Sequence, residues 1–393
     1  MLDSLIATVS RSLVSRLVFG ALVILILLGA ELGRRPALTP SASAVWPAPE
    51  KSFAVNALVP MGRGAIPMPP ETPAAHASTL LAMPGTDPSA LLAFWFAGTR
   101  ESAPDVQIAA SRFDRATQQW SAARFVVNRY ALADQLGFSV RRLGNPVAWL
   151  DRQGKVHLFV VATGLGGWAA GRIVHLRQRN EEPDFEQLSF DVVRVLPLSW
   201  LWNTSFLVRA APLALADGGM VLPVYFELGV KYPVALHFDA TGEFKGMVRI
   251  SSQKHLLQPT LLMQSPTHWL ALMRDQRPNG KVAAAQTMDS GEHWSDLPSL
   301  ALDNPDSSVA GLAVAPGQLF LAYNSSPHSR EMLDLSGSTQ GLSWALVQAL
   351  AHGDGAEYSY PALAWADDSL WVSYTDHRQR IAWQRFSLPS SAR

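Results

Sequence analysis

The chain has 393 residues, enough for two or three domains or for one large β or α/β unit. Its 32 Lys and Arg residues balance its 32 Asp and Glu residues, so no overall positive charge favours nucleic acid as a partner. The absence of cysteine excludes disulfides, thiolate-bound metals and cysteine nucleophiles, and 48% hydrophobic residues argue against disorder.

A membrane segment is the first predicted element, after a short stretch at 1–16. Fourteen uncharged residues run from Leu17 to Ala30, with two arginines on either side. A span needs about 20 apolar residues, or about 17 at the short end, so residues 17–32 are predicted to form a short transmembrane helix or a signal segment. A signal peptide cleaved near Ala42-Ser43-Ala44 and a buried soluble helix remain alternatives. The anchor and the signal both predict a location in the cell envelope, periplasmic or extracellular.

The next segment, residues 33–73, contains nine prolines and has no sustained apolar period. Proline restricts the backbone and favours extended conformations, so this segment is expected to be a semi-rigid tether between membrane and domain.

Residues 74–388 are predicted to be all-β, followed by a short tail at 389–393. Short apolar or alternating runs recur and end in turn residues, among them Leu91–Phe96, Val156–Ala162, Trp269–Met273, Leu319–Tyr323 and Ser369–Tyr374. No amphipathic helical pattern exceeds about two turns. Such evenly spaced strands are typical of a sandwich, a barrel or a propeller.

An internal repeat favours the propeller. Residues 287–294 (TMDSGEHW) fit an Asp-box pattern, in which hydroxyl and carboxylate groups close a hairpin loop and a tryptophan packs between sheets. Weaker copies run from Ser111 to Trp120 and from Ser336 to Trp344. Trp294 and Trp344 are one four-stranded blade apart, and the β region has the length of six such blades. The sequence therefore predicts a six-bladed β-propeller.

The β region resembles the sialidase (neuraminidase) superfamily, in particular its bacterial BNR/Asp-box branch. The resemblance rests on nine motifs in order: His76–Thr79, Gly98–Glu101 with Asp105, Gly144–Pro146, Gln258–Thr260, Arg274-Asp275, Asn304-Pro305, Tyr323-Asn324 with Arg330, Tyr358–Pro361, and Tyr374-Thr375 with Arg378 and Arg380. Each motif is weak alone, but their order over the whole region indicates a sialidase-like fold.

The resemblance implies a site for an acidic sugar. Sialidases hold the substrate carboxylate with three arginines, and they use a tyrosine nucleophile instead of a second carboxylate. By motif position, Arg274 and Arg330 correspond to two of these arginines and Tyr360 to the nucleophile.

Two positions depart from the family pattern. His76 stands where the first arginine is expected, and Gln258 stands where a glutamate should activate the tyrosine. Because an amide cannot accept the phenolic proton, either Glu227, Glu357 or another group is the base, or Tyr360 is not a nucleophile. His76 is open to three interpretations: acid/base, cationic anchor, or structural histidine.

The proton donor and the sugar-binding amides are also predicted by position. Glu101 and Asp105 lie where the family has its acidic residue, with Glu101 favoured over Asp105. Asn145, Asn304 and Asn324 follow or end predicted strands, and with Gln258 they offer amides to sugar hydroxyls, although local turn capping is the competing interpretation.

Together these features predict a membrane-tethered exo-glycosidase of the exo-alpha-sialidase type, which removes a terminal acidic sugar from a glycan or polysaccharide. The alternative is a non-catalytic glycan-binding or envelope-assembly propeller. No cofactor and no metal site are expected, because the ten histidines show no ligand spacing. The oligomeric state is left open.

Overall fold

The computed structural model describes residues 2–34, 42–51, 54–180, 184–278 and 280–387, so the tail predicted at 389–393 lies outside the described residues. The chain divides into two compact units, which are described separately. One contains Met1–Ala37 and Pro197–Asn203, and the other contains Leu38–Leu196 and Thr204–Arg393.

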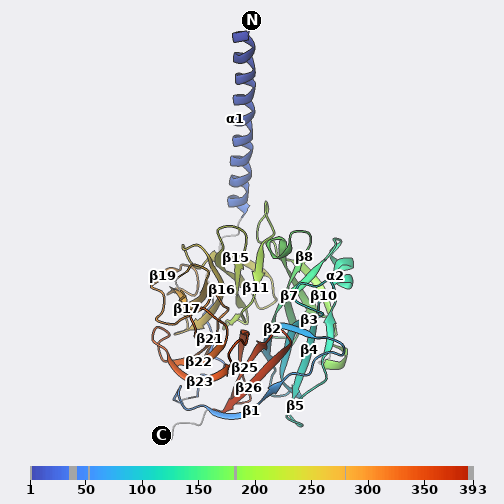
Figure 1. The fold of residues 1–393 in the computed structure, drawn as a ribbon, viewed down its shortest axis with the longest axis vertical. Helices are drawn as coiled ribbons and strands as arrows, with labels where there is room; N and C mark the ends of the chain where they lie inside the picture. Colours follow the sequence, from blue (N-terminus) through green and yellow to red (C-terminus); the bar gives the residue numbers. More distant parts are fainter. Residues whose placement is uncertain (1, 35–41, 52–53, 181–183, 279, 388–393) are drawn as a thin grey trace. The chain divides into compact units, whose positions relative to one another are not determined.

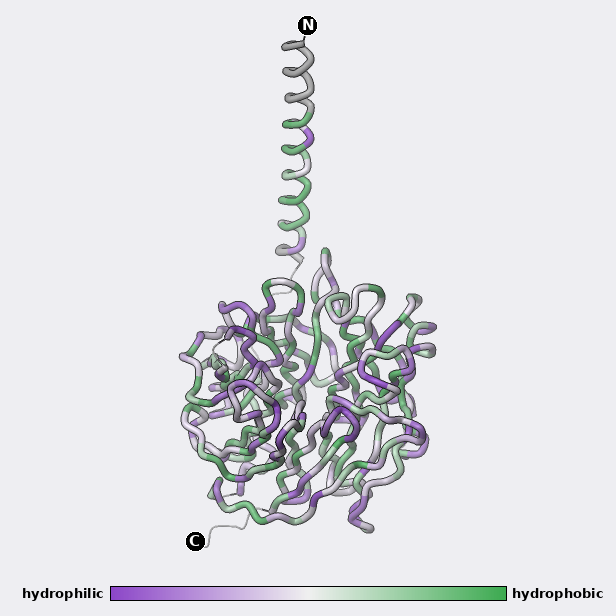
Figure 2. Tube along the Cα trace, viewed as in Figure 1, coloured by the Kyte–Doolittle hydropathy of each residue, from purple (hydrophilic) through white to green (hydrophobic). Residues whose placement is uncertain are grey.

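The smaller unit is built on helix α1 (Leu2–Arg34). Its stretch Leu13–Glu31 is long and apolar enough to cross a membrane, and most of its apolar side chains are exposed. In Figure 2 most of this stretch has the colour of hydrophobic residues. The prediction of a single N-terminal apolar helix that could span a membrane is confirmed.

The larger unit is an all-β propeller of six sheets, here called blades 1 to 6 in chain order. Figure 1 shows them following one another around the unit, from cyan through green and yellow to red. The first three blades hold β2 (Ala74–Ala82), β3 (Ser89–Gly98), β4 (Gln107–Asp114), β5 (Gln119–Trp120) and β6 (Arg124–Val127); β7 (Arg142–Leu150), β8 (Val156–Thr163), β9 (Gly171–Gln178) and β10 (Phe190–Val195); and β11 (Phe206–Val208), β12 (Leu213–Ala214), β13 (Met220–Phe226), β14 (Tyr232–Phe238) and β15 (Phe244–Arg249).

The last three blades hold β16 (Leu256–Met263), β17 (Trp269–Asp275), β18 (Ala283–Thr287) and β19 (Ser295–Leu297); β20 (Ala310–Ala315), β21 (Gln318–Asn324), β22 (Met332–Ser338) and β23 (Ala345–His352); and β24 (Tyr358–Ala366), β25 (Ser369–Asp376) and β26 (Arg380–Ser387) with β1 (Val59–Ala65). Short helices lie in the connections: α2 (Arg129–Leu136), η1 (Gly167–Ala170) and η2 (Phe185–Gln187). The prediction of six blades is confirmed.

Blade 6 joins the two ends of the propeller chain, because its outermost strand β1 pairs antiparallel with β26. β1 lies inside the segment 33–73 that the sequence predicts to be a tether, so this part is a strand and not a linker. Ala44 also forms a β-bridge with Leu215. The proline content of this segment predicted a linker, but an edge strand such as β1 can contain a proline at a position where no backbone N–H has to bond to the neighbouring strand.

The apolar core lies between neighbouring blades. Separate clusters of buried residues fill the spaces between blades 1 and 2, 1 and 6, and 5 and 6, and a larger one extends over blades 3, 4 and 5. Strands such as β3 and β8 are buried along their whole length because both faces of the sheet are covered.

The predicted Asp box closes the β18–β19 hairpin as expected. Thr287 Oγ1 accepts from the N–H of Gly291 at 3.0 Å, Asp289 accepts from the N–H of His293 at 2.9 Å, and Trp294 Nε1 donates to the Gly291 carbonyl at 3.1 Å. The copy ending at Trp344 differs from the prediction, because Ser338 and not Ser336 accepts from the N–H of Gly341, at 2.7 Å.

Four inner strands carry the same β-bulge, in which two residues oppose one on the neighbouring strand. The bulged pairs are Ala77-Ser78 in β2, Asn145-Pro146 in β7, Gln258-Pro259 in β16 and Tyr360-Pro361 in β24. The first residue of each pair has a positive φ between 43° and 53°. A bulge redirects a side chain, and proline fits its second position because no ladder hydrogen bond is required there. Three of the four bulges carry proline at the second position: Asn145-Pro146, Gln258-Pro259 and Tyr360-Pro361.

Candidate active site

The bulges of blades 4 and 6 bring Gln258 and Tyr360 together. The amide nitrogen of Gln258 lies 3.5 Å from the hydroxyl of Tyr360 and 3.4 Å from the hydroxyl of Tyr225. The amide oxygen of Gln258 accepts a 3.4 Å contact from Arg274. Burial, together with the neighbouring Tyr360, raises the pKa of Tyr225, so its phenol stays protonated at neutral pH.

The ring of Tyr360 lies between a histidine and a buried arginine. The His76 imidazole approaches it with ring centroids 4.4 Å apart, and the guanidinium carbon of Arg209 lies 5.1 Å from the ring centroid. Arg209 follows β11 in blade 3 and donates to the carbonyls of Ser78, at 3.2 Å, and Pro361, at 2.7 Å. It therefore connects three blades directly beside the phenol.

Arg209 is a buried cation that donates hydrogen bonds to backbone carbonyls, and only 3% of it is exposed. Burial lowers its pKa to about 10, so the group stays charged at neutral pH. A positive charge in a low-dielectric environment stabilises any negative charge that develops on the neighbouring phenol oxygen.

A chain of ion pairs and hydrogen bonds starts at Arg274, which contacts Gln258, and extends to Glu101. Arg274 Nε contacts the Asp306 carboxylate, Arg330 donates to the Asp306 carbonyl at 3.0 Å and contacts Glu357 at 3.4 Å, and Arg378 pairs bidentately with Glu357 at 2.8–3.0 Å. Arg378 also pairs with Glu101. We call Arg274, Asp306, Arg330, Glu357, Arg378 and Glu101 the ion-pair chain.

The three arginines of the ion-pair chain become more exposed from one to the next. Their side chains are 12%, 22% and 44% exposed for Arg274, Arg330 and Arg378. Burial acts against the charge of Arg274, but the hydrogen bond to Asp306 and the electrostatic effects of Tyr360, Asp306 and Tyr225 together outweigh burial and raise the pKa of this group. The hydrogen bonds from Arg378 hold the pKa of Glu357 below its usual range, so this carboxylate is ionised at neutral pH. It is already paired with two arginines, which argues against Glu357 as the base that activates Tyr360.

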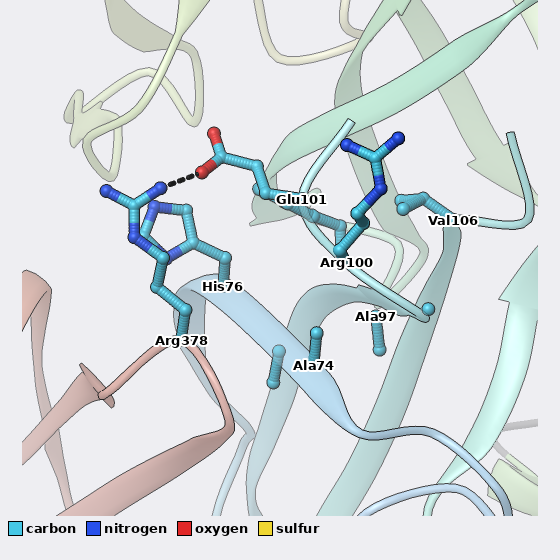
Figure 3. A pocket seen from close by; sticks show the side chains of 10 residues that line it. Ala74, His76, Ala97, Arg100, Glu101, Val106 and Arg378 are labelled. Atoms are coloured by element: carbon cyan, nitrogen blue, oxygen red, sulfur yellow. Dashed lines mark hydrogen bonds and ion pairs between the residues drawn. The ribbon is translucent and has the colours of Figure 1, made fainter. Parts of the chain in front are cut away.

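Figure 3 shows the part of the site where the Arg378 side chain pairs with Glu101, which follows strand β3 of blade 1. The small pocket there is lined by His76, Glu101, Arg100 and Arg378, together with Ala74, Phe96 and Gly98. Glu101 extends toward the guanidinium of Arg378, and His76 lies beside that guanidinium.

His76 is neutral, which argues against a cationic anchor. Burial, followed by the positive charges of Arg378, Arg209 and Arg330, lowers its pKa well below the ordinary value. Its Nδ1 is buried and has no hydrogen-bond partner among the described residues. The backbone carbonyl expected for a purely structural histidine is therefore not found at this atom.

Of the two predicted proton donors, Glu101 belongs to the cluster and Asp105 does not. Asp105 accepts hydrogen bonds from the backbone N–H and the hydroxyl of Thr99, both at 2.9 Å. These bonds close the loop between β3 and β4, a local role that the sequence spacing could not distinguish from catalysis.

The predicted asparagines divide in the same way. Asn304 is buried and caps a turn by accepting from the N–H of Ser307 at 2.9 Å. Asn324 accepts from the Ser307 hydroxyl and donates to the carbonyls of Met332 and Tyr358 at 3.0 and 2.9 Å. Both therefore stabilise the loops behind Arg330 and are not available to a sugar. Asn145 remains a candidate because it occupies the bulge position equivalent to that of Tyr360.

The sequence did not predict Arg209 or Asp306 as site residues, and Arg378 was named only as part of a motif. Arg209 is a single charge within an apolar run, FLVRAAPLALA, and this pattern indicates a buried cation with a defined partner. The loop before β20 carries Asp306, whose φ is positive at 53°.

Comparisons with known proteins agree with this architecture. The family model of the BNR repeat-like domain matches residues 89–372. A Hadza microbial sialidase superposes with a TM-score of 0.63 and 16% identity, over 80% of this chain and 66% of its own. Trypanosoma rangeli sialidase in complex with the inhibitor DANA gives 0.62 and 12%, over 86% and 60%. No curated protein sequence matches the chain.

A protein of unknown function from Dyadobacter fermentans superposes with a TM-score of 0.65 and 10% identity, over 85% of this chain and all of its own. This chain spans less than two thirds of the Hadza and Trypanosoma sialidase chains. At these identities the likeness establishes the fold alone, a sialidase-like propeller.

Proposed function

The chain belongs to the BNR repeat-like domain family, and we propose that it is an exo-glycosidase that removes a terminal acidic sugar from a glycan or polysaccharide. The observation that carries the proposal is the convergence of guanidinium groups and one phenol. Arg274 contacts Gln258, Gln258 contacts Tyr360, and the ion-pair chain links Arg274 to Arg330 and Arg378.

Arg274, Arg330 and Arg378 are proposed to bind the sugar carboxylate. Guanidinium groups pair with a carboxylate through two parallel N–H donors, so several of them fix its orientation as well as its charge. Arg378 would supply the third cation that His76 does not provide, since His76 is neutral. Its greater exposure agrees with a role at the substrate-facing end.

Glu101 is proposed as the proton donor. In the free protein its carboxylate pairs with Arg378. A substrate carboxylate that binds Arg378 would compete for the same guanidinium and leave Glu101 without this cation. The released Glu101 side chain could then turn toward the leaving oxygen and donate a proton to it.

Tyr360 is proposed as the nucleophile. Its oxygen would form a bond to the anomeric carbon while the bond to the leaving sugar breaks and Glu101 protonates the leaving oxygen. The phenolic proton would pass to His76, whose Nδ1 is unpartnered among the described residues. Arg209 would stabilise the negative charge on the phenol from behind the ring. Water then attacks the anomeric carbon while the bond from that carbon to the Tyr360 oxygen breaks. Glu101 accepts the proton of the water, and the released phenolate takes its proton back from His76.

A second candidate function is a binding propeller without catalysis, and Gln258 is the observation that favours it. Its amide nitrogen contacts the Tyr360 hydroxyl at 3.5 Å. An amide cannot act as a base, whereas the arginines would still recognise an acidic sugar. The two candidates therefore share a ligand and differ in turnover.

We further propose that α1 spans a membrane and holds the propeller in the cell envelope. The stretch Leu13–Glu31 has the length and composition of a span, and most of its apolar side chains are exposed. An unburied apolar helix of this kind needs a lipid environment or removal by processing.

Turnover by the full chain in detergent tests the enzyme proposal. Fluorogenic sialosides and uronides would be incubated with the protein, with Tyr360→Phe, and with Tyr358→Phe as a matched loss of one hydroxyl outside the cluster. Hydrolysis that Tyr360→Phe abolishes and Tyr358→Phe preserves supports the proposal. Binding of these sugars without hydrolysis would support the second candidate instead.

A further inference from the structure

The loop Pro197–Asn203 connects β10 to β11 and presents three large apolar side chains outward. Trp200, Leu201 and Trp202 are 51%, 51% and 54% exposed. The loop backbone is fixed from within, because the side-chain oxygen of Asn203 accepts from the N–H groups of Leu198 and Ser199, at 2.9 and 3.3 Å. Ser199 Oγ accepts from the N–H of Trp202 at 2.9 Å. The three apolar side chains are therefore exposed on a turn whose backbone is held by hydrogen bonds.

This loop belongs to the same compact unit as α1 and contacts the end of its apolar stretch. The carboxylate of Glu31 accepts from the N–H of Trp200 at 2.8 Å and from the N–H of Leu201 at 3.2 Å. Glu31 is the last residue of the stretch that could cross a membrane, and only 9% of it is exposed. The loop therefore lies at the depth where a spanning helix leaves the hydrocarbon.

The chemistry of the loop fits that depth. Tryptophan is enriched at the boundary between membrane and water, because its ring is mostly apolar while its indole N–H needs a polar partner. The segment PLSWLWN contains no charged residue. Its attraction to a membrane would therefore come from apolar burial and not from charge, and it requires no anionic lipid.

We propose that Trp200, Leu201 and Trp202 form a second membrane contact, which inserts into the interfacial layer of the bilayer next to the end of α1. The inference rests on the proposed membrane span. Glu31 positions the contact, because two backbone N–H donors compensate its carboxylate at the membrane boundary. Since the loop lies between blades 2 and 3, the propeller chain would be tied to the membrane at two points of its sequence.

The chain contains no cysteine, so a single introduced thiol can be labelled uniquely. Full-length Leu201→Cys would carry a nitroxide in vesicles of phosphatidylcholine, and Leu346→Cys, at a site 62% exposed in β23, would be the matched control. We expect the ratio of oxygen accessibility to nickel-chelate accessibility to be several-fold higher at 201 than at 346, since oxygen concentrates in lipid and the chelate in water.

Glu31 is tested with the same label. Glu31→Ala removes the acceptor and is expected to lower the ratio at 201 toward the control value, whereas Glu31→Gln keeps an acceptor oxygen and preserves the ratio. An unchanged ratio in Glu31→Ala would overturn the positioning role of Glu31.

Flotation of the vesicles separates failure of the anchor from failure of the loop. Protein that does not float overturns both the span and this inference. Protein that floats while the ratio at 201 equals that at 346 overturns the loop contact alone. Spectral broadening at 201 that disappears on dilution with unlabelled protein would identify a second copy of the chain as the partner, and it would also overturn the membrane contact.

Discussion

Gln258 and Tyr360 occupy the same position of the same β-bulge in two different blades, and their side chains meet 3.5 Å apart. Both have a positive φ, 50° and 53°, and both precede a proline. Four blades share this β-bulge, and the residue at its first position differs from blade to blade. The chemistry of the site therefore depends on which side chain each blade carries at that position.

Gln258→Glu is predicted to raise glycosidase activity. A carboxylate at this position would lie beside the hydroxyl of Tyr360 and within reach of Arg274, so it could accept the phenolic proton. General-base assistance contributes about 100-fold or more, and an increase on the order of tenfold to 100-fold in kcat is expected. Gln258→Met, which has similar size and no polar end, is the control. Equal activity of Glu and Met variants would contradict a nucleophilic Tyr360.

Arg274→Met is predicted to weaken the binding of acidic sugars. Losing one charge-assisted hydrogen-bond donor costs about 1.5–3 kcal/mol, which corresponds to roughly tenfold to 100-fold in affinity. Titration calorimetry with a sialoside or uronide measures the change. Arg179→Met is the matched control, because Arg179 also pairs with an aspartate but lies in blade 2 with 56% of its side chain exposed. Similar affinities in both variants would remove Arg274 from the binding site.

The fold was largely predictable, because turn residues, alternating strands and one Asp box determine it locally. The closing strand β1 was not, since the proline-rich sequence around residues 59–65 contains no strand pattern of its own. It becomes a strand only because β26 has unpaired backbone N–H and C=O groups with which it can form hydrogen bonds. Likewise, sequence order identified Tyr360, Arg274 and Arg330, but only the ring geometry shows that Arg209 reaches across from blade 3.

Truncation tests the closing strand. A chain beginning at residue 42 keeps β1, whereas a chain beginning at residue 71 loses it and leaves β26 as an unpaired edge. Six paired residues are lost, and at about 0.5–1.5 kcal/mol for each net hydrogen bond the free energy of unfolding should fall by roughly 3 kcal/mol or more. Urea denaturation of the two chains measures the difference. Equal midpoints would mean that β1 adds nothing to ring closure.

Acidification is predicted to destabilise the propeller through its buried histidines. Burial lowers the pKa of His175 to about 3, and His157 beside it is lowered too. Because the folded-state pKa lies below the unfolded value of about 6.5, the contribution to stability is present above that pH. It is lost as pH falls from about 6.5 toward 3, by up to about 1.4 kcal/mol per pH unit for each group.

The thermal midpoint of the full chain between pH 7.5 and 4.5 measures this loss, and His175→Gln removes one of the groups without adding charge. The variant should show a shallower decline than the unmodified chain over this interval. Parallel curves would show that His175 titrates in the folded state much as it does in the unfolded chain.

The central claim is that Tyr360 forms a bond to an acidic sugar. Fluorinated sialosides and uronides, which slow the second step of a retaining glycosidase, would be incubated with the full chain, and the mass of the intact protein would be recorded. The proposal predicts the addition of one glycosyl group, located on the peptide that contains Tyr360 and absent from Tyr360→Phe. An unchanged mass, with calorimetry showing that the same compounds bind, would contradict it and leave a propeller that recognises acidic sugars without cleaving them.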